Sequence, residues 1–224
     1  MVKKNPIDSS CDEKVSDALS KLKLGRTTHD ALVLSAMWGN ILLVWVVILV
    51  ITMHYKIFDN EKTRLFRMFA LVVTVSVYTG GWIMAYFYLH LKPQFGDCAV
   101  AADPMNKKLF NLGKFPISQW PLSHFILFMG FGFMGPWGWW LYILFGVGWE
   151  GVELLMKHLQ KKTNAKTART RINTNEYTYL TYWESTFEDI ILNTAGVAVG
   201  VGLAKLVDMY RPFGLHYRQG FIHK

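Results

Sequence analysis

Cysteine is scarce in this chain, and so are repeats and low-complexity tracts. Its 224 residues hold two cysteines, Cys11 and Cys98, which form no CxxC pair and no dense framework. Cysteines spaced in this way predict neither a zinc site nor a dependable disulfide.

Charge is absent altogether from the run Ala31 to Met53. About 20 apolar residues are enough to cross the hydrocarbon layer of a bilayer. The apolar core of a cleaved signal peptide is shorter and follows a basic region. We therefore expect a retained membrane span here, preceded by a polar leader over residues 1–30.

The composition is that of a membrane protein. Hydrophobic residues make up 52% of the chain and aromatic residues 15%, and the mean hydropathy is +0.20. The net charge of +8 would also suit nucleic acid, but basic residues of membrane proteins usually lie in cytoplasmic loops and face anionic lipid. We expect a membrane as partner and no nucleic acid.

The hydropathy pattern predicts an all-α, polytopic helical membrane protein of about five spans. A break is expected at Gly135-Pro136, because proline lacks an amide proton and clashes with the preceding helical turn. The expected spans cover residues 31–53, 67–90, 121–134, 136–157 and 183–207, which together form a transmembrane domain over 31–207 before a polar tail at 208–224.

The polar segments set the expected orientation. The leader is interpreted as a partly ordered tail, although Val15, Leu19 and Leu22 would also suit a short amphipathic helix. Residues 91–120, rich in proline and glycine, are expected to be a loop. A cytoplasmic N-terminus places the leader, this loop and the basic connector 157–181 on one side, as the positive-inside rule favours.

Seven polar residues lie inside or at the mouths of the expected spans. An ionisable group in hydrocarbon is costly unless it pairs, binds a cation or faces water, so it marks a candidate functional site. Helical spacing puts several of them on shared faces, and the expected topology places them roughly 10–15 Å from one membrane edge. The seven are His124, Glu150, Glu153, Glu184, Glu188, Asp189 and Asn193.

Oxygen ligands of this kind suit a hard cation, calcium above all. A single histidine without a nearby cysteine argues against structural zinc. A bound cation would polarise a phosphate, and His124 would accept a proton near neutral pH.

Other interpretations stay open for these residues. His124 would also suit an interfacial hydrogen bond, and Glu184 and Glu188 are favoured at a helix start by the helix dipole alone. The remaining acids would also suit structural pairing between helices. A stripe of small residues at Gly196, Gly200 and Gly202 predicts close helix packing.

Two segments resemble the core of the base-exchange phosphatidylserine synthases. They are SHFILFMGFGFMGPWGWWLYILFGVGWEGVEL, which begins at Ser123, and YWESTFEDIILNTAGVAVG, which begins at Tyr182. The same motifs are more distantly similar to VanZ-like small membrane proteins. The connector is longer than in the synthases, and the spacing from Asp189 to Asn193 is shorter.

The resemblance implies calcium-dependent exchange in the endoplasmic reticulum membrane, in which the hydroxyl of serine attacks a phospholipid phosphate. His124 matches the base of that family. The residues that match its metal site are Glu150, Glu153, Glu184, Glu188, Asp189 and Asn193.

We therefore expect a phosphatidylserine synthase-like head-group transferase with phospholipid and serine as substrates. The alternative is a non-catalytic membrane subunit or assembly factor with the same fold, and either is compatible with an oligomer or a larger complex. A conduit for cations or protons ranks last, because its acids would be spread through the depth of the bilayer.

Overall fold

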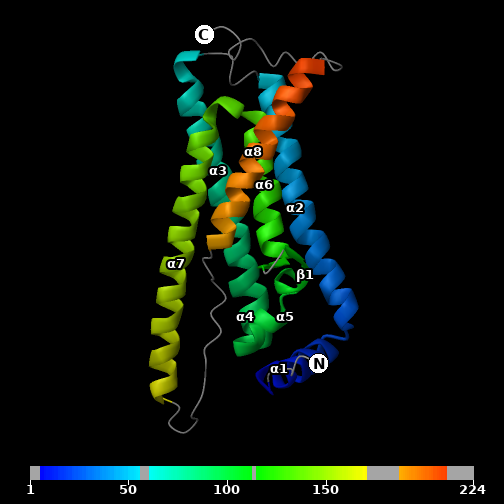
Figure 1. The fold of residues 1–224 in the computed structure, drawn as a ribbon. Coiled ribbons are helices and arrows are strands. Elements are labelled where there is room, and N and C mark those ends of the chain that lie inside the picture. Colours follow the sequence, from blue (N-terminus) through cyan, green and yellow to red (C-terminus); the bar gives the residue numbers. More distant parts are fainter. Residues whose placement is uncertain (1–5, 56–60, 113–114, 171–186, 211–224) are drawn as a thin grey trace. The chain divides into compact units, whose positions relative to one another are not determined.

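A computed structural model describes residues 6–55, 61–112, 115–170 and 187–210 (Figure 1). Nearly all of them are helical. The longer helices are α1 (Pro6–Lys21), α2 (Arg26–Tyr55), α3 (Glu61–Ala85), α6 (Gln119–Met134), α7 (Trp139–Thr170) and α8 (Phe187–Tyr210). The shorter elements are the π-helix η1 (Tyr86–Leu91), α4 (Lys92–Phe95), η2 (Gly96–Cys98), α5 (Ala99–Ala102), η3 (Pro104–Asn106), η4 (Pro136–Gly138) and the strands β1 (Lys108–Leu112) and β2 (Phe115–Ser118).

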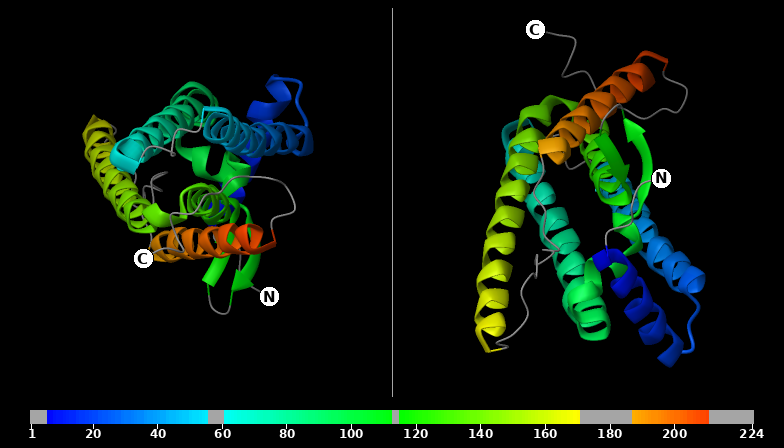
Figure 2. Two further views of the ribbon diagram at one scale, coloured as in Figure 1. Left: turned by 90° about the horizontal axis from the view of Figure 1, so that it is seen from above. Right: turned by 60° about the horizontal axis from the view of Figure 1, so that its bottom comes forward.

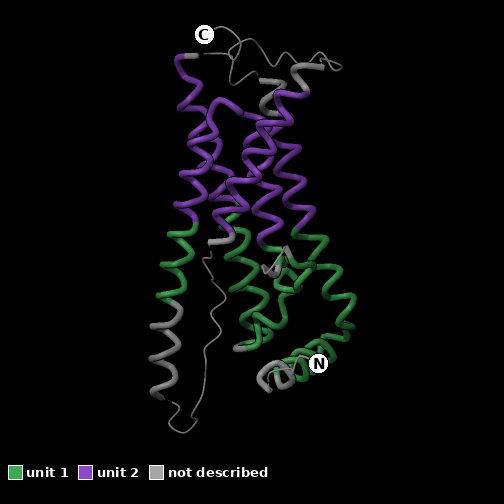
Figure 3. The backbone as a smooth tube through the Cα atoms, in the orientation of Figure 1, with its two compact units in different colours: residues 1–37, 79–120, 150–185 green, residues 38–78, 121–149, 186–224 purple. Residues whose placement is uncertain are grey.

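The chain divides into two compact units, which are coloured separately in Figure 3. Unit 1 consists of residues 1–37, 79–120 and 150–185, and unit 2 of residues 38–78, 121–149 and 186–224. The expected division into a leader, a membrane domain over 31–207 and a tail from 208 stays a prediction, and residues 211–224 of that tail lie outside the described part.

Within the described part of the chain, three segments are long and apolar enough to cross a membrane. They are Arg26–Val50, Lys62–Phe95 and Asp189–Leu206. The pair formed by α6 and the helix that follows it is bent by 113° and raises the number to four at most. The all-α class is thus confirmed, with three or four candidate spans. Five spans are not confirmed, because α6 has 16 residues and about 20 are needed for a full crossing.

The break between α6 and α7 lies where Gly135-Pro136 predicts it. The last helical turn of α6 ends with the bond from the Gly135 amide to the Phe131 carbonyl oxygen at 3.0 Å. After the turn η4, the rings of Phe131 and Tyr142 stack with centroids 5.4 Å apart. The bend therefore returns α7 toward the face of α6 within unit 2.

Close backbone packing joins α6 and α8 in unit 2. A Cβ atom on Gly196 would lie 2.4 Å from the Phe125 carbonyl oxygen, and one on Gly200 would lie 2.1 Å from that of Met129. Each step of four residues in α8 matches a step of four in α6, so the two helices run in the same direction. The predicted close packing is confirmed at these two glycines and wrong at Gly202, where no heavy atom of the described residues outside its own stretch of helix lies within 4 Å of the Cβ position.

The leader is more ordered than the partly ordered tail that the sequence predicts. It forms the ordered helix α1, in which Val15 and Leu19 are buried. Cys11 and Cys98 form a disulfide that joins α1 to η2, with the two Cα atoms 5.3 Å apart. The sequence alone predicted no dependable disulfide, whereas the structure contains one. Cysteines separated by 87 positions have no recognisable spacing, and only tertiary packing brings them within bonding reach.

Residues 91–120 are likewise more regular than a loop. They fold into the short helices α4, η2, α5 and η3, followed by an antiparallel pair of strands in which Lys108 faces Ser118 and Leu112 faces Phe115. The strand pair is visible in the right-hand view of Figure 2. Local turns and side-chain contacts organise this segment, so periodicity gives no sign of it.

Candidate functional site

Three of the predicted site residues belong to one unit of the structure. α6 places His124 in unit 2, and α8 places Asp189 and Asn193 there, one turn apart on a single face. Asp189 is 6% exposed and Asn193 is 2% exposed. We call His124, Asp189 and Asn193 the membrane polar cluster.

His124 and Asn193 lie at one level of unit 2, and Asp189 lies one helical turn from Asn193. The register between α6 and α8 puts Asn193 opposite the turn that holds His124. Asp189 is close enough to His124 for its charge to act on the ring. The Nδ2 atom of Asn193 faces α7, where a Cβ on Gly146 would be 3.2 Å from it.

The membrane polar cluster contains buried atoms that could form further hydrogen bonds. Within the described residues, neither the Nδ1 atom of His124 nor the amide nitrogen and oxygen of Asn193 has a hydrogen-bond partner. Buried polar groups are nearly always bonded, so such atoms call for an explanation. A polar ligand or water bound at this point would provide it.

The other predicted ligands are placed differently or not at all. Glu150 and Glu153 lie in the part of α7 that belongs to unit 1, where Glu150 is 3% exposed. Glu184 lies outside the described residues, as does the side chain of Glu188. The predicted convergence of all the acids on one site therefore stays a prediction.

The donor chemistry partly fits calcium. Asp189 and Asn193 offer the oxygen atoms that a hard cation prefers, but calcium takes six to eight of them. Among the residues that the structure describes, no three His, Cys, Asp or Glu side chains gather as a metal-binding group. A cation at this point would need most of its oxygens from lipid phosphate and water.

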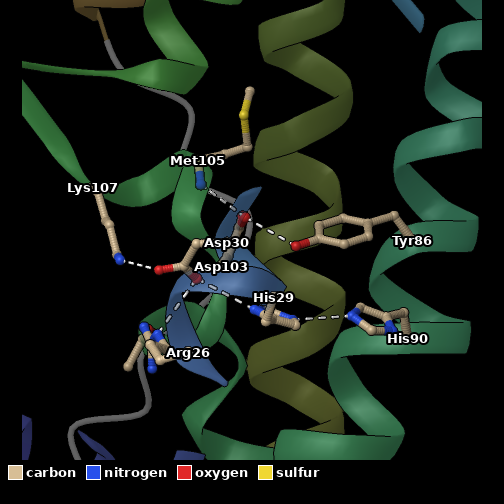
Figure 4. A network of polar contacts seen from close by, with 9 residues as sticks. Arg26, His29, Asp30, Tyr86, His90, Asp103, Met105 and Lys107 are labelled. Atoms are coloured by element: carbon tan, nitrogen blue, oxygen red, sulfur yellow. Dashed lines mark hydrogen bonds and ion pairs between the residues drawn. The ribbon is translucent and has the colours of Figure 1, made fainter. Parts of the chain in front are cut away.

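A second polar cluster, in unit 1, was not predicted. His29 of α2 is 2% exposed, and its Nε2 atom lies 3.3 Å from the Nε2 atom of His90 in η1. The Nδ1 atom of the same ring lies 3.3 Å from Oδ1 of Asp30. Figure 4 shows the three groups as one chain, with His29 between the carboxylate and His90. We call His29 and His90 the histidine pair.

Asp30 is held from two further directions in unit 1. Lys107 donates a hydrogen bond to its Oδ2 atom, and Nε of Arg26 lies 3.4 Å from its Oδ1 atom. Arg26 also donates to the carbonyl oxygen of Ala101 at 2.7 Å. The carboxylate is thereby fixed beside the imidazole of His29.

Asp103 orders the surroundings of the histidine pair. It is 1% exposed, and it accepts hydrogen bonds from the Met105 amide at 3.0 Å, the Tyr86 hydroxyl at 3.1 Å and the Trp120 indole at 3.0 Å. These donors come from three elements. The carboxylate therefore ties η1, η3 and the start of α6 together.

The sequence holds a weak signal for the histidine pair. His29 lies near the start of the first candidate span, which begins at Arg26. His90 lies near the end of the second, which ends at Phe95. Two consecutive spans begin and end at the same membrane edge, so this pairing follows from topology. The two histidines are 61 positions apart, and no motif links them in the sequence.

Comparison with known proteins gives no relative: the chain matches no family model, no curated protein and no solved structure. The resemblance to base-exchange phosphatidylserine synthases thus rests on the quoted motifs alone. The structure establishes the coarser statement, a helical protein with three or four candidate membrane spans.

Proposed function

We propose that this chain is an integral membrane protein that exchanges the head group of a phospholipid at the membrane polar cluster. The observation that supports it is the set of buried atoms on His124 and Asn193 with no partner among the described residues. Polar groups inside apolar helices are costly and are kept where they serve a function. The phosphate is the part of a phospholipid that needs polar ligands.

In this proposal, His124 is the general base. It takes the proton from the hydroxyl of serine as that oxygen bonds to the lipid phosphorus. The bond from phosphorus to the oxygen of choline or ethanolamine breaks, and the departing oxygen takes the proton back from His124. The Asn193 amide donates to a phosphate oxygen.

Calcium belongs to the proposal as a cation that the side-chain oxygens of Asp189 and Asn193 would help to hold. When bound, it would polarise the phosphate as a Lewis acid. The family likeness implies the endoplasmic reticulum as the membrane to examine first.

The test is incorporation of labelled serine into lipid by membranes that contain the chain. We expect His124→Ala to lower the rate about 10²–10⁴-fold, the usual contribution of a general base. Asn193→Ala should also lower it, and chelation by EGTA should abolish it. Thr194→Ala is the matched control, because Thr194 is exposed and its hydroxyl donates a hydrogen bond to the Ile190 carbonyl oxygen. Full activity in His124→Ala would refute the proposed base.

The same measurement separates the alternative function. A non-catalytic membrane subunit is favoured by the lack of a three-residue metal group in the described part of the chain. It predicts background labelling from the unmodified protein and from every variant. Co-purification of a partner protein with both the unmodified chain and His124→Ala would then support the role of a non-catalytic subunit.

A further inference from the structure

We propose that the histidine pair of unit 1 binds a transition-metal ion, with zinc as the ion it fits best. This site is separate from the membrane polar cluster and does not depend on the proposed function. The two imidazoles meet through their Nε2 atoms, which are within hydrogen-bonding distance, and the ion would replace the proton that lies between them.

The spacing of the two nitrogens matches a metal site. Zinc binds imidazole nitrogen at about 2.0–2.1 Å in tetrahedral geometry, which sets two such nitrogens about 3.3 Å apart. The Nε2 atoms of His29 and His90 are 3.3 Å apart. The rings are nearly parallel, with an interplanar angle of 16°, and their Nε2 atoms face each other across this distance.

The carboxylate behind His29 is the second argument. A metal-binding histidine usually gives its other ring N–H to a carboxylate, which fixes the tautomer and raises the basicity of the ligand. Asp30 occupies that position at 3.3 Å. Lys107 and Arg26 hold Asp30 in place, so the Nε2 atom of His29 is presented as a lone pair.

The backbone and the surrounding rings give a third argument. His90 belongs to a six-residue π-helix, Tyr86–Leu91, and π-helical turns occur frequently at functional sites. Tyr86 stacks on His90 with centroids 5.6 Å apart, and Phe95 meets His29 edge-on at 5.6 Å. This aromatic wall limits water around the imidazoles, which strengthens their bonds to a cation.

The site would be open. Within the described residues, no third His, Cys, Asp or Glu joins the pair, so water or a small anion would complete the tetrahedron. Imidazole ligands suit zinc, copper, iron and nickel rather than calcium or magnesium. The site thus differs in metal chemistry from the oxygen donors of unit 2.

The experiment is a zinc titration of the full chain, purified in detergent with a histidine-free tag and freed of metal. We expect one zinc ion per chain in competition with a chromogenic chelator, and an X-ray absorption spectrum with two imidazole ligands. His29→Gln and His90→Gln should each abolish this stoichiometric binding. Asp30→Asn should weaken it about 10–100-fold, as loss of such a carboxylate does.

His158→Gln provides the matched control, because His158 is an exposed histidine of α7. It should bind zinc as the unmodified chain does. Intact mobility on a non-reducing gel, which reports the Cys11–Cys98 disulfide, shows that each variant is folded. Equal zinc binding by the unmodified chain and by folded His29→Gln/His90→Gln would overturn the proposal, and so would absence of binding to the unmodified chain.

Discussion

At the scale of single residues, glycine decides how α6 and α8 meet. Gly196 and Gly200 lie where backbone atoms of α6 leave no space for a side chain. In lipid, helices associate through such close packing, because apolar side chains gain nothing by leaving lipid for protein. The same packing sets the level of Asn193 against His124, so the membrane polar cluster depends on it.

The first prediction concerns Gly200. A Cβ at this position would lie 2.1 Å from the Met129 carbonyl oxygen and 2.7 Å from the Phe133 amide, and backbone atoms cannot rotate away. Gly200→Ala should lower the free energy of unfolding by about 1–3 kcal/mol, as overpacking does. Thermal unfolding in detergent measures the effect.

Gly202→Ala is the control in the same helix, because no heavy atom lies within 4 Å of its Cβ position. Alanine favours a helix over glycine, so the melting temperature should stay the same or rise. Equal melting temperatures for the two variants would contradict the packing described for α6 and α8.

At the scale of elements, the disulfide fixes α1 to η2. Among the side chains of α1 that the structure describes, only Cys11, Val15 and Leu19 are buried, so the covalent link adds a constraint that this small apolar contact cannot supply. Cytosolic thiols are kept reduced, and disulfides persist in oxidising compartments. The bond therefore indicates that α1 and η2 face an oxidising space.

This conclusion opposes part of the expected orientation. The distribution of Lys and Arg predicts a cytoplasmic leader, whereas the disulfide favours the opposite side of the membrane for it. The expectation that the leader and residues 91–120 share one side agrees with the bond between Cys11 and Cys98.

The second prediction concerns this bond. Cys11→Ser should lower the free energy of unfolding by about 2–4 kcal/mol, because the cross-link restricts the unfolded chain. Reductant should lower the melting temperature of the unmodified chain and leave that of Cys11→Ser unchanged. Cys98→Ser should match Cys11→Ser, and the double variant should be no less stable than either. Maleimide labelling of the unmodified chain without prior reduction would show that the bond is absent.

At the scale of the whole molecule, the bend between α6 and α7 governs the topology. A change of direction of 113° is more than a right angle, so the chain turns back after α6 rather than continuing through the bilayer. A pair that turns back as a re-entrant loop adds no crossing, whereas a pair that acts as one broken span adds one. With the three long segments, the re-entrant arrangement gives three crossings, which is an odd number.

The third prediction follows: a tag at the N-terminus and a tag at the C-terminus should lie on opposite sides of the membrane. The disulfide further predicts that the N-terminal tag faces the oxidising side. Glycosylation acceptor sites or protease protection at each tag measure this. Protection of both tags on the same side would indicate four crossings, with α6 and α7 acting as one bent span.

Some structural features of this protein could be predicted from particular residues in the sequence. The uncharged run from Ala31 predicted a long membrane helix, and Gly135-Pro136 predicted the break between α6 and α7. The pairing of Asp189 with Asn193 on one helix face followed from their spacing. These features are local, because hydrophobic length, proline chemistry and helical periodicity act within about 25 neighbouring residues.

Other features depended on segments that are far apart in the chain. The Cys11–Cys98 bond, the meeting of His29 with His90 and the contact of Gly200 with Met129 all join residues that share no local pattern. By itself, the sequence determined a helical membrane protein and where its helices break. Only the tertiary structure decided which polar and sulfur atoms lie within bonding distance, because that distance is set by the packing of whole helices.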